Sequence, residues 1–205
     1  MKTEVFTAEI FKNCILAAEQ RLLDNKEYLN FLDINFMADH DTGNNIYQLF
    51  KDLKNEINNI EIISMESICN AIIKITTNKP KGNSSIAIGL FLQKIAKEII
   101  KYEKIECYEL SEIIQKACNI LPKAISNPKE KSIITITNSI SYIMNETYMF
   151  AYLDDLFKEI LVYENIIIDK TKINNLYDAG AKGLIIIFEA FYISITNDTN
   201  LENIN

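Results

Sequence analysis

Apolar residues recur at helical spacing along almost the whole chain, and this pattern constrains the fold more than any other feature of the sequence. Isoleucine, leucine and phenylalanine return every three or four residues, as on a helix with one buried face. Residues 133–137 have a strand-like composition, but helical spacing continues through Ile140 and Ile143, and no partner strand is evident elsewhere. We therefore expect an all-α protein of about eight helices. The segments with this pattern are residues 7–25, 44–57, 64–78, 86–99, 109–121, 133–143, 148–163 and 184–195.

Local signals mark where several of these helices begin and end. Thr7 and Ser64 are of the residue types that cap helix N-termini, and Pro122 is expected to stop the helix before it. Residues 28–36 are expected to form a short connector. A chain of 205 residues suffices for one well-buried domain and is short for two, so we expect a single domain over residues 1–205. The ends that we expect to be frayed are residues 1–5 and 197–205.

The net charge of -7 limits the partners that the chain can have. Nucleic acids and anionic membranes both need a basic protein face, so neither is expected as a partner. No apolar run reaches the ~18 residues of a membrane span, and residues 1–10 lack the apolar core of a signal peptide. Cys14, Cys69, Cys107 and Cys118 form no Cys-x-x-Cys pair, which favours reduced, buried thiols in a cytoplasmic protein over disulfides.

The densest polar stretch is Asp39-His40-Asp41-Thr42-Gly43-Asn44-Asn45, which contains the chain's single histidine and follows Asp33 by six residues. Two carboxylates on one short loop repel each other unless a cation lies between them, and a hard divalent cation is the usual solution. The same residues could instead form a solvated turn ahead of the next helix, because Asp, Asn and Gly are common in turns. The stretch is the first candidate for a metal site, and both interpretations are open.

Glycine is scarce in this chain, and its positions indicate where the backbone must turn sharply or approach a ligand. Four of the five glycines lie in three short loops that each precede a helix. In the second loop, Gly82-Asn83-Ser84-Ser85, free backbone N–H groups could hold phosphate oxygens, or the loop could simply carry a serine cap. The concentration of glycine predicts that the three loops converge on one site. The glycines are Gly43, Gly82, Gly89, Gly180 and Gly183.

Four motifs in this order resemble the nucleotide-binding domain shared by the L subunit of dihydroxyacetone kinase and the N-terminal part of bacterial fatty-acid kinase. Asp33 and residues 39–45 are similar to the family's upstream Asp or Asn and its Asp-Gly-Asp-(Thr/His)-Gly-x-Asn. Residues 82–85 are similar to the Gly-Asn-Ser-Gly loop of the fatty-acid kinases, and Ser132 stands where a later loop ends in Thr. Asp178-Ala179-Gly180-Ala181-Lys182-Gly183 matches Asp-(Ser/Ala)-Gly-(Gly/Ala)-Lys-Gly. The order and spacing agree from about residue 6 to residue 195.

The resemblance implies a fold and a site. The family's fold is a closed barrel of about eight antiparallel helices that binds the nucleotide at one end. Its loop carboxylates hold a pair of Mg²⁺ ions, and by this match Asp33, Asp39 and Asp41 would be the metal ligands. The residues that would contact ATP or ADP are Thr42, Gly43, Asn44, Asn45, Gly82, Asn83, Ser84, Ser85, Ser132, Asp178, Ala179 and Gly180.

Several residues depart from the family pattern. His40 replaces the glycine between the two loop Asp residues. It could point out of the loop, contact a phosphate or a metal ion, or mean that the site no longer closes on two metals. Ser85 and Lys131 also replace family glycines, and Ala38 replaces a proline. These replacements question catalysis more than they question the fold.

The function that this resemblance implies is the ATP- or ADP-Mg²⁺-binding subunit of a two-component kinase. The acceptor, a small hydroxy or keto compound or a fatty acid, would be held by a separate substrate-binding subunit or a fatty-acid-binding protein. No convincing general base or nucleophile is evident, and phosphoryl transfer needs mainly positioning and charge neutralisation. One alternative is a degenerate, non-catalytic nucleotide-binding or regulatory member of the same fold. Another is a metal-dependent phosphohydrolase, which rests on the carboxylates alone.

Overall fold

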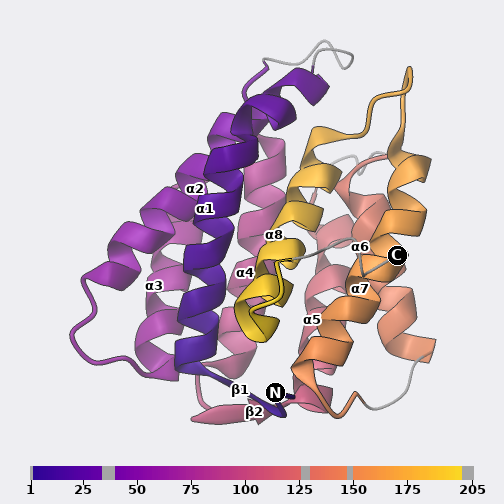
Figure 1. The fold of residues 1–205 in the computed structure, drawn as a ribbon. Coiled ribbons are helices and arrows are strands. Elements are labelled where there is room, and N and C mark those ends of the chain that lie inside the picture. The colour runs from indigo at the N-terminus through magenta and orange to yellow at the C-terminus, as the bar shows by residue number, and fades with distance from the viewer. Residues whose placement is uncertain (1, 34–39, 126–129, 147–149, 200–205) are drawn as a thin grey trace.

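The structure is a computed structural model that describes residues 2–33, 40–125, 130–146 and 150–199. Helices dominate the described residues, so the all-α expectation is confirmed (Figure 1). The elements in chain order are β1 (Val5–Thr7), α1 (Ala8–Leu32), α2 (Thr42–Asn58), α3 (Met65–Asn78), α4 (Asn83–Ile99), β2 (Lys104–Glu106), α5 (Cys107–Ala124), α6 (Ile133–Glu146), α7 (Leu153–Ile167), the 3-10 helix η2 (Ile168–Thr171) and α8 (Ala179–Thr196).

Helices that are consecutive in the sequence are neighbours in space. Each α-helix packs against the next, and α8 packs back against α1. α8 also contacts α2, α4 and α6, so it is enclosed on most sides (Figure 1). Its Phe188 packs against Phe91 of α4, with ring centroids 5.8 Å apart, and against Phe157 of α7 at 6.2 Å. This enclosure explains why the sequence of α8 is apolar nearly all round.

By length and composition, α8 is the one helix among the described residues that could cross a membrane. About two thirds of it, 67%, is buried inside the protein, as in the core helix of a globular domain. The sequence expectation concerned an unbroken apolar run of ~18 residues, and α8 contains none, since Lys182 and Glu189 interrupt it. These two are the only charged residues among the 18 of α8, so its average composition resembles that of a membrane span although the helix lies in the core.

Both predicted helix caps are confirmed. The Thr7 hydroxyl accepts a hydrogen bond from the Ile10 N–H at 3.3 Å and opens α1. The Ser64 hydroxyl accepts one from the Ser67 N–H at 3.1 Å, and Ser67 Oγ accepts in return from the Ser64 N–H, which forms a capping box. Each cap satisfies backbone donors that a helix leaves unpaired at its first turn.

Several helix ends differ from those that the sequence predicts. α1 continues to Leu32, because Leu29 and Leu32 both face the core, so residues 28–32 are helical and form no connector. Pro122 lies inside α5, which ends two residues later at Ala124. α8 begins at Ala179, five residues earlier than the apolar pattern indicates, because the Asp178 side chain caps its first turn.

The described residues contain one small sheet, which no sequence pattern predicted. β1 and β2 pair antiparallel, with Phe6 opposite Ile105 and both side chains buried. Just before β1, the Thr3 carbonyl accepts a hydrogen bond from the Leu153 N–H at 2.7 Å, at the start of α7. The chain's first residues therefore join the beginnings of α5 and α7 (Figure 1).

The cysteines are as expected, since Cys14, Cys69, Cys107 and Cys118 are all free and buried. Burial raises the pKa of the Cys14, Cys69 and Cys107 thiols to about 12. Thiols with such values stay protonated near neutral pH and behave as small apolar side chains in the core.

Candidate functional site

The predicted site residues that the structure describes all lie at one end of the helices, the upper end in Figure 1. α1 ends there, and α2, α4, α6 and α8 begin there. The first turn of each helix leaves backbone N–H groups without partners and carries the positive end of the helix dipole. Four such turns at one end therefore suit the binding of an anion.

Asp33 and the first turn of α2 are joined directly. Asp33 is only 6% exposed, and its Oδ2 accepts a hydrogen bond from the Thr42 N–H at 3.0 Å. The Asn44 N–H donates to Asn30 Oδ1 at 3.2 Å. These two bonds hold the start of α2 against the last turn of α1. A carboxylate that accepts one backbone hydrogen bond has further lone pairs with which it can hold a cation.

Gly43 makes this close approach possible. A Cβ atom at Gly43 would lie 2.0 Å from the carbonyl oxygen of Lys26 in α1. A contact that short with backbone cannot be relieved by moving a side chain, so any other residue would push α2 away from α1.

Asp41 and His40 are both exposed beside this junction. Asp41 is the N-cap residue of α2 but makes no side-chain bond to the helix, while its carbonyl oxygen accepts a hydrogen bond from the Asn45 N–H at 2.8 Å. His40 has a φ of 53°, the left-handed conformation that glycine adopts easily. The third predicted metal ligand, Asp39, lies outside the described residues, within which no group of three potential metal ligands is found.

The second loop contacts the first. Gly82 precedes α4 with a φ of 74° and provides no side-chain cap, so the first N–H groups of α4 have no capping side chain. A Cβ at Gly82 would lie 2.8 Å from Nδ2 of Asn45. Ser85 is buried, and its hydroxyl donates to the carbonyl oxygens of Lys81 and Gly82. Ser85 therefore points into the loop and braces it.

The last motif contacts the second loop. A Cβ at Gly180 would lie 2.6 Å from the hydroxyl oxygen of Ser84, so the first turns of α8 and α4 meet at the missing side chain. The Asp178 carboxylate caps α8 by accepting a hydrogen bond from the Ala181 N–H at 2.7 Å.

Asp178 links this motif to Asp33 and to α6. Burial and, to a smaller extent, the nearby Asp33 carboxylate raise the pKa of the Asp178 carboxyl to about 6. Hydrogen bonds from the backbone N–H groups of Ala181, Ile133 and Gly180 act in the opposite direction. The carboxyl groups of Asp33, which follows α1, and Asp178, which precedes α8, are therefore close enough to interact at this end of the helices.

The Ser132 loop completes the group of loops. The Ser132 hydroxyl accepts a hydrogen bond from the Ile134 N–H at 3.3 Å and opens α6 next to Asp178. Lys131 before it has a φ of 60°, the second left-handed residue at a family glycine position. These contacts bring the three glycine loops together, as predicted, and the Ser132 loop lies with them.

Sequence reasoning missed two residues that support the site. Asn30 falls in the segment that the sequence predicts to be a connector. In the structure it lies in α1, one turn before Asp33, and this position places its side chain against the start of α2. Thr171 is fully buried in η2, and its hydroxyl accepts a hydrogen bond from the Asp178 N–H at 3.4 Å. No sequence pattern indicated Thr171, because the contact depends on how η2 packs against α8.

The fold and the site together define a class of helical domain in which acidic side chains and helix N-termini gather at one end. The chain belongs to the DAK2 domain family, whose model matches residues 36–193. The resemblance to dihydroxyacetone kinase is thereby confirmed at the level of the family and the fold.

Relatives and solved structures extend this result. The chain is 22% identical over 207 residues to Protein YloV of Bacillus subtilis, covering 97% of this chain and 37% of that protein. It is also 22% identical over 203 residues to an uncharacterized protein of Staphylococcus haemolyticus, covering 93% and 36%. The crystal structure of dihydroxyacetone kinase from C. freundii in complex with AMP-PNP and Mg²⁺ has a similar fold, with a TM-score of 0.67 and 13% identity over 95% of this chain and 35% of that one. The chain thus spans between 35% and 37% of these proteins.

Proposed function

We propose that this chain binds ATP or ADP with Mg²⁺ and acts as the nucleotide-binding subunit of a two-component kinase. The observation that carries the proposal is the contact of the four motifs at one end of the helices. Asp33 and Asp178 lie close enough there to interact electrostatically, and the uncapped first turn of α4 lies beside the capped first turn of α8. A chain with a net charge of -7 can hold a polyphosphate when cations and helix dipoles offset the repulsion. The structurally similar kinase crystallised with AMP-PNP and Mg²⁺ supports the same ligand class.

Each predicted residue has a role in this proposal. Asp33, Asp39 and Asp41 would hold the Mg²⁺ ions, because carboxylate oxygens are the ligands that this ion prefers. Mg²⁺ would neutralise phosphate charge and align the transferred group. The backbone N–H groups and hydroxyls that would contact the nucleotide belong to residues 42–45, 82–85, 132 and 178–180.

The acceptor would be supplied by another protein in the cytoplasm. A separate substrate-binding subunit or a fatty-acid-binding protein would present a hydroxy or keto compound or a fatty acid. We further propose that the ring of helix contacts, closed by α8 against α1, forms a closed barrel with the nucleotide at one end.

A non-catalytic nucleotide-binding protein is the alternative, and the replaced family glycines are its motivation. His40 and Lys131 both keep a left-handed backbone, with φ values of 53° and 60°. Ser85 directs its hydroxyl into its own loop. Because the loops keep conformations suited to glycine, these replacements favour a working site over a degenerate one.

Calorimetric titration of ADP in the presence of Mg²⁺ tests the proposal. The wild type is expected to bind with a Kd in the micromolar range, which corresponds to a binding free energy of about -8 kcal/mol. Asp41→Asn and Gly180→Ala are expected to weaken binding at least ~10-fold, because one removes a metal ligand and the other separates α8 from Ser84. Asp24→Asn, an exposed acid on α1, is the matched control and should bind as the wild type does. Absence of binding by the wild type, or unchanged binding by Asp41→Asn, would overturn the proposal.

A second measurement separates the kinase from its alternative. ATP turnover is assayed with a candidate substrate-binding partner and its acceptor present. Phosphoryl transfer that disappears in Asp41→Asn supports the kinase, whereas tight nucleotide binding without transfer supports the non-catalytic protein. Hydrolysis of a generic phosphate ester with Mg²⁺ alone would instead point to a phosphohydrolase.

A further inference from the structure

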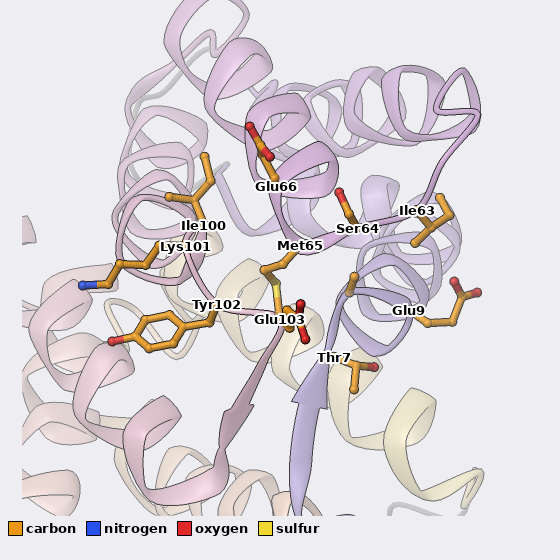
Figure 2. A pocket seen from close by; sticks show the side chains of 11 residues that line it. Thr7, Glu9, Ile63, Ser64, Met65, Glu66, Ile100, Lys101, Tyr102 and Glu103 are labelled. Atoms are coloured by element: carbon orange, nitrogen blue, oxygen red, sulfur yellow. The ribbon is translucent and has the colours of Figure 1, made fainter.

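A groove of about 500 Å³ lies at the opposite end of the helices from the candidate site (Figure 2). It is formed by the start of α1, the start of α3 and the turn that follows α4. α4 begins at the candidate site and ends at the groove, and its 17 residues correspond to about 25 Å at 1.5 Å per residue. The groove is therefore separate from the proposed nucleotide site, and what it binds is a separate question.

The floor of the groove is apolar. Met65 is buried and projects toward the middle of the groove, while Ile63 and Ile100 flank it and are half-buried (Figure 2). Next to Ile63, Ile62 is 78% exposed, the largest exposure among the large hydrophobic side chains of the described residues. A guest that covered this surface would remove apolar area from water, which is favourable in proportion to the area.

The rim of the groove is acidic, with Glu9, Glu66 and Glu103 around the floor. Among the described residues, neither Glu66 nor Glu103 has an ion pair or a side-chain hydrogen bond. Glu103 also follows the C-terminal end of α4, where the helix dipole is negative and disfavours a carboxylate. A cation in the groove would relieve this arrangement.

The chain's own lysine in the groove does not neutralise these carboxylates. Lys101 places its ammonium 5.2 Å from the centre of the Tyr102 ring, and Figure 2 shows it directed away from Met65 and Glu103. Glu9 pairs with Lys12, and Glu66 lies in the first turn of α3, where the helix dipole favours a carboxylate. Glu103 has neither compensation among the described residues, so the groove presents apolar side chains beside an unpaired carboxylate.

We propose that this groove docks a short segment of a partner protein that carries an arginine or lysine between apolar residues. The cationic head lies on the acidic rim that carries Glu66 and Glu103, and the apolar neighbours cover the half-buried Ile63 and Ile100. Arginine and lysine suit this position because their aliphatic stems pack on apolar surface while their charged heads reach carboxylates. The volume fits a few side chains and is too small for a folded domain.

Fluorescence anisotropy with a defined peptide tests the proposal. The probe is a fluorescein-labelled peptide, Gly-Ser-Leu-Arg-Leu-Arg-Leu-Gly-Ser, titrated with the full chain at low salt. The double variant Glu66→Gln/Glu103→Gln is expected to raise the Kd at least ~5-fold, the effect of losing two exposed ion pairs. The matched control is Glu27→Gln/Glu112→Gln, which removes two carboxylates that are 80% and 65% exposed outside the groove. It should change the Kd less than ~2-fold.

Two further peptides separate the parts of the proposal. A peptide with Glu in place of Arg, and one with Ser in place of Leu, should both bind more weakly than the probe. Equal weakening by the two double variants would mean that only the net charge acts, and would overturn the proposal. Equal binding of the Ser peptide would overturn it too, since any small polycation would then suffice. Circular dichroism of each variant confirms that it is folded.

Discussion

At the scale of single residues, the departures from the family pattern keep the backbone of the residues that they replace. His40 and Lys131 stand where the family has glycine, and they adopt φ values of 53° and 60°. A residue with a Cβ in this region costs roughly 1 kcal/mol relative to glycine. The sequence could identify the replaced glycines, but it could not tell whether the loops had changed shape or had kept their shape under strain.

This strain predicts that Lys131→Gly and His40→Gly stabilise the protein. Each is expected to raise the free energy of unfolding by about 1 kcal/mol over the alanine variant at the same position. Lys131→Ala and His40→Ala are the controls, because they remove the side chain and keep the strain. Urea denaturation of the four variants measures the differences, and equal stability of the Gly and Ala variants would contradict the conformation described for these loops.

Glu164 is a further residue whose role the sequence did not indicate. It is 2% exposed in α7, and neither carboxylate oxygen has a hydrogen-bond partner among the described residues. Burial raises the pKa of Glu164 well above its ordinary value of 4.5, and Glu189 raises it further, while Lys182 acts in the opposite direction. Glu189 itself forms an ion pair with Arg21, and its Oε1 lies 3.7 Å from Nζ of Lys182. A neutral acid at this position is consistent with an interior where one carboxylate already serves two cations.

The raised pKa predicts a pH-dependent stability. The folded chain binds the Glu164 proton more tightly than the unfolded chain, so the contribution of this proton is complete below about pH 4.5 and is lost as the pH rises toward the folded-state pKa. Glu164→Met is expected to raise the free energy of unfolding by about 1–3 kcal/mol at pH 8 and by less at pH 5. Urea titrations at the two pH values measure this change.

The control for this prediction is Glu164→Gln. It keeps the size and the unpaired polar atoms but cannot ionise, so it should reduce the pH dependence and give a smaller gain than methionine. If the slope of stability against pH is the same in the wild type and in Glu164→Gln, another group is responsible for it.

At the scale of the elements, the helices could be predicted because each one repeats its apolar pattern over several turns. The strand pair could not, since Val5–Thr7 and Lys104–Glu106 are three residues each and are far apart in the sequence. Such strands are too short to show alternation, and their pairing depends on the finished fold. The end of α1 was missed for a related reason, because only the packing of Leu29 and Leu32 shows that the helix continues.

The candidate site was predictable in its residue types and not in its contacts. Spacing and family resemblance selected Asp33, Gly82 and Asp178, which the structure brings to one end of the helices. The bracing by Asn30 and Thr171 depends on the angle at which helices meet, which no local pattern encodes.

The space around two glycines predicts that substitution by alanine changes the free energy of unfolding in opposite directions. Gly43→Ala is expected to lower the free energy of unfolding by about 2–3 kcal/mol, because its Cβ would lie 2.0 Å from backbone of α1. A Cβ atom at Gly89 would lie 3.2 Å from Cγ of the Pro80 ring and 3.7 Å from Cβ and the carbonyl oxygen of Thr76. Gly89→Ala is expected to gain up to about 1 kcal/mol from helix propensity. Thermal and urea unfolding compare the two variants, and similar effects would show that α1 and α2 are not in the contact described here.

At the scale of the whole molecule, the helix order joins the candidate site to the rest of the core. α8 begins at the site with Asp178 and contacts five other α-helices along its length. The end of α1 and the starts of α2, α4 and α6 also reach the site. A ligand held between these ends would therefore restrain most of the helices at once, and its binding energy would add to the stability of the whole domain.

The last prediction follows from this connection. ADP with Mg²⁺ at about 100 times its Kd is expected to add about 2.7 kcal/mol to the stability of the wild type, which corresponds to a rise in Tm of about 5–10 °C for a domain of this size. The chain has ten tyrosines and no tryptophan, so tyrosine fluorescence and far-UV circular dichroism give two independent melting curves. Both curves should shift together in the wild type, because one domain unfolds as a unit, and at the same ADP concentration they should shift by no more than about half as much in Asp41→Asn. Curves that separate would mean that only part of the chain responds to the nucleotide, and curves that both stay in place would mean that these converging loops bind no nucleotide.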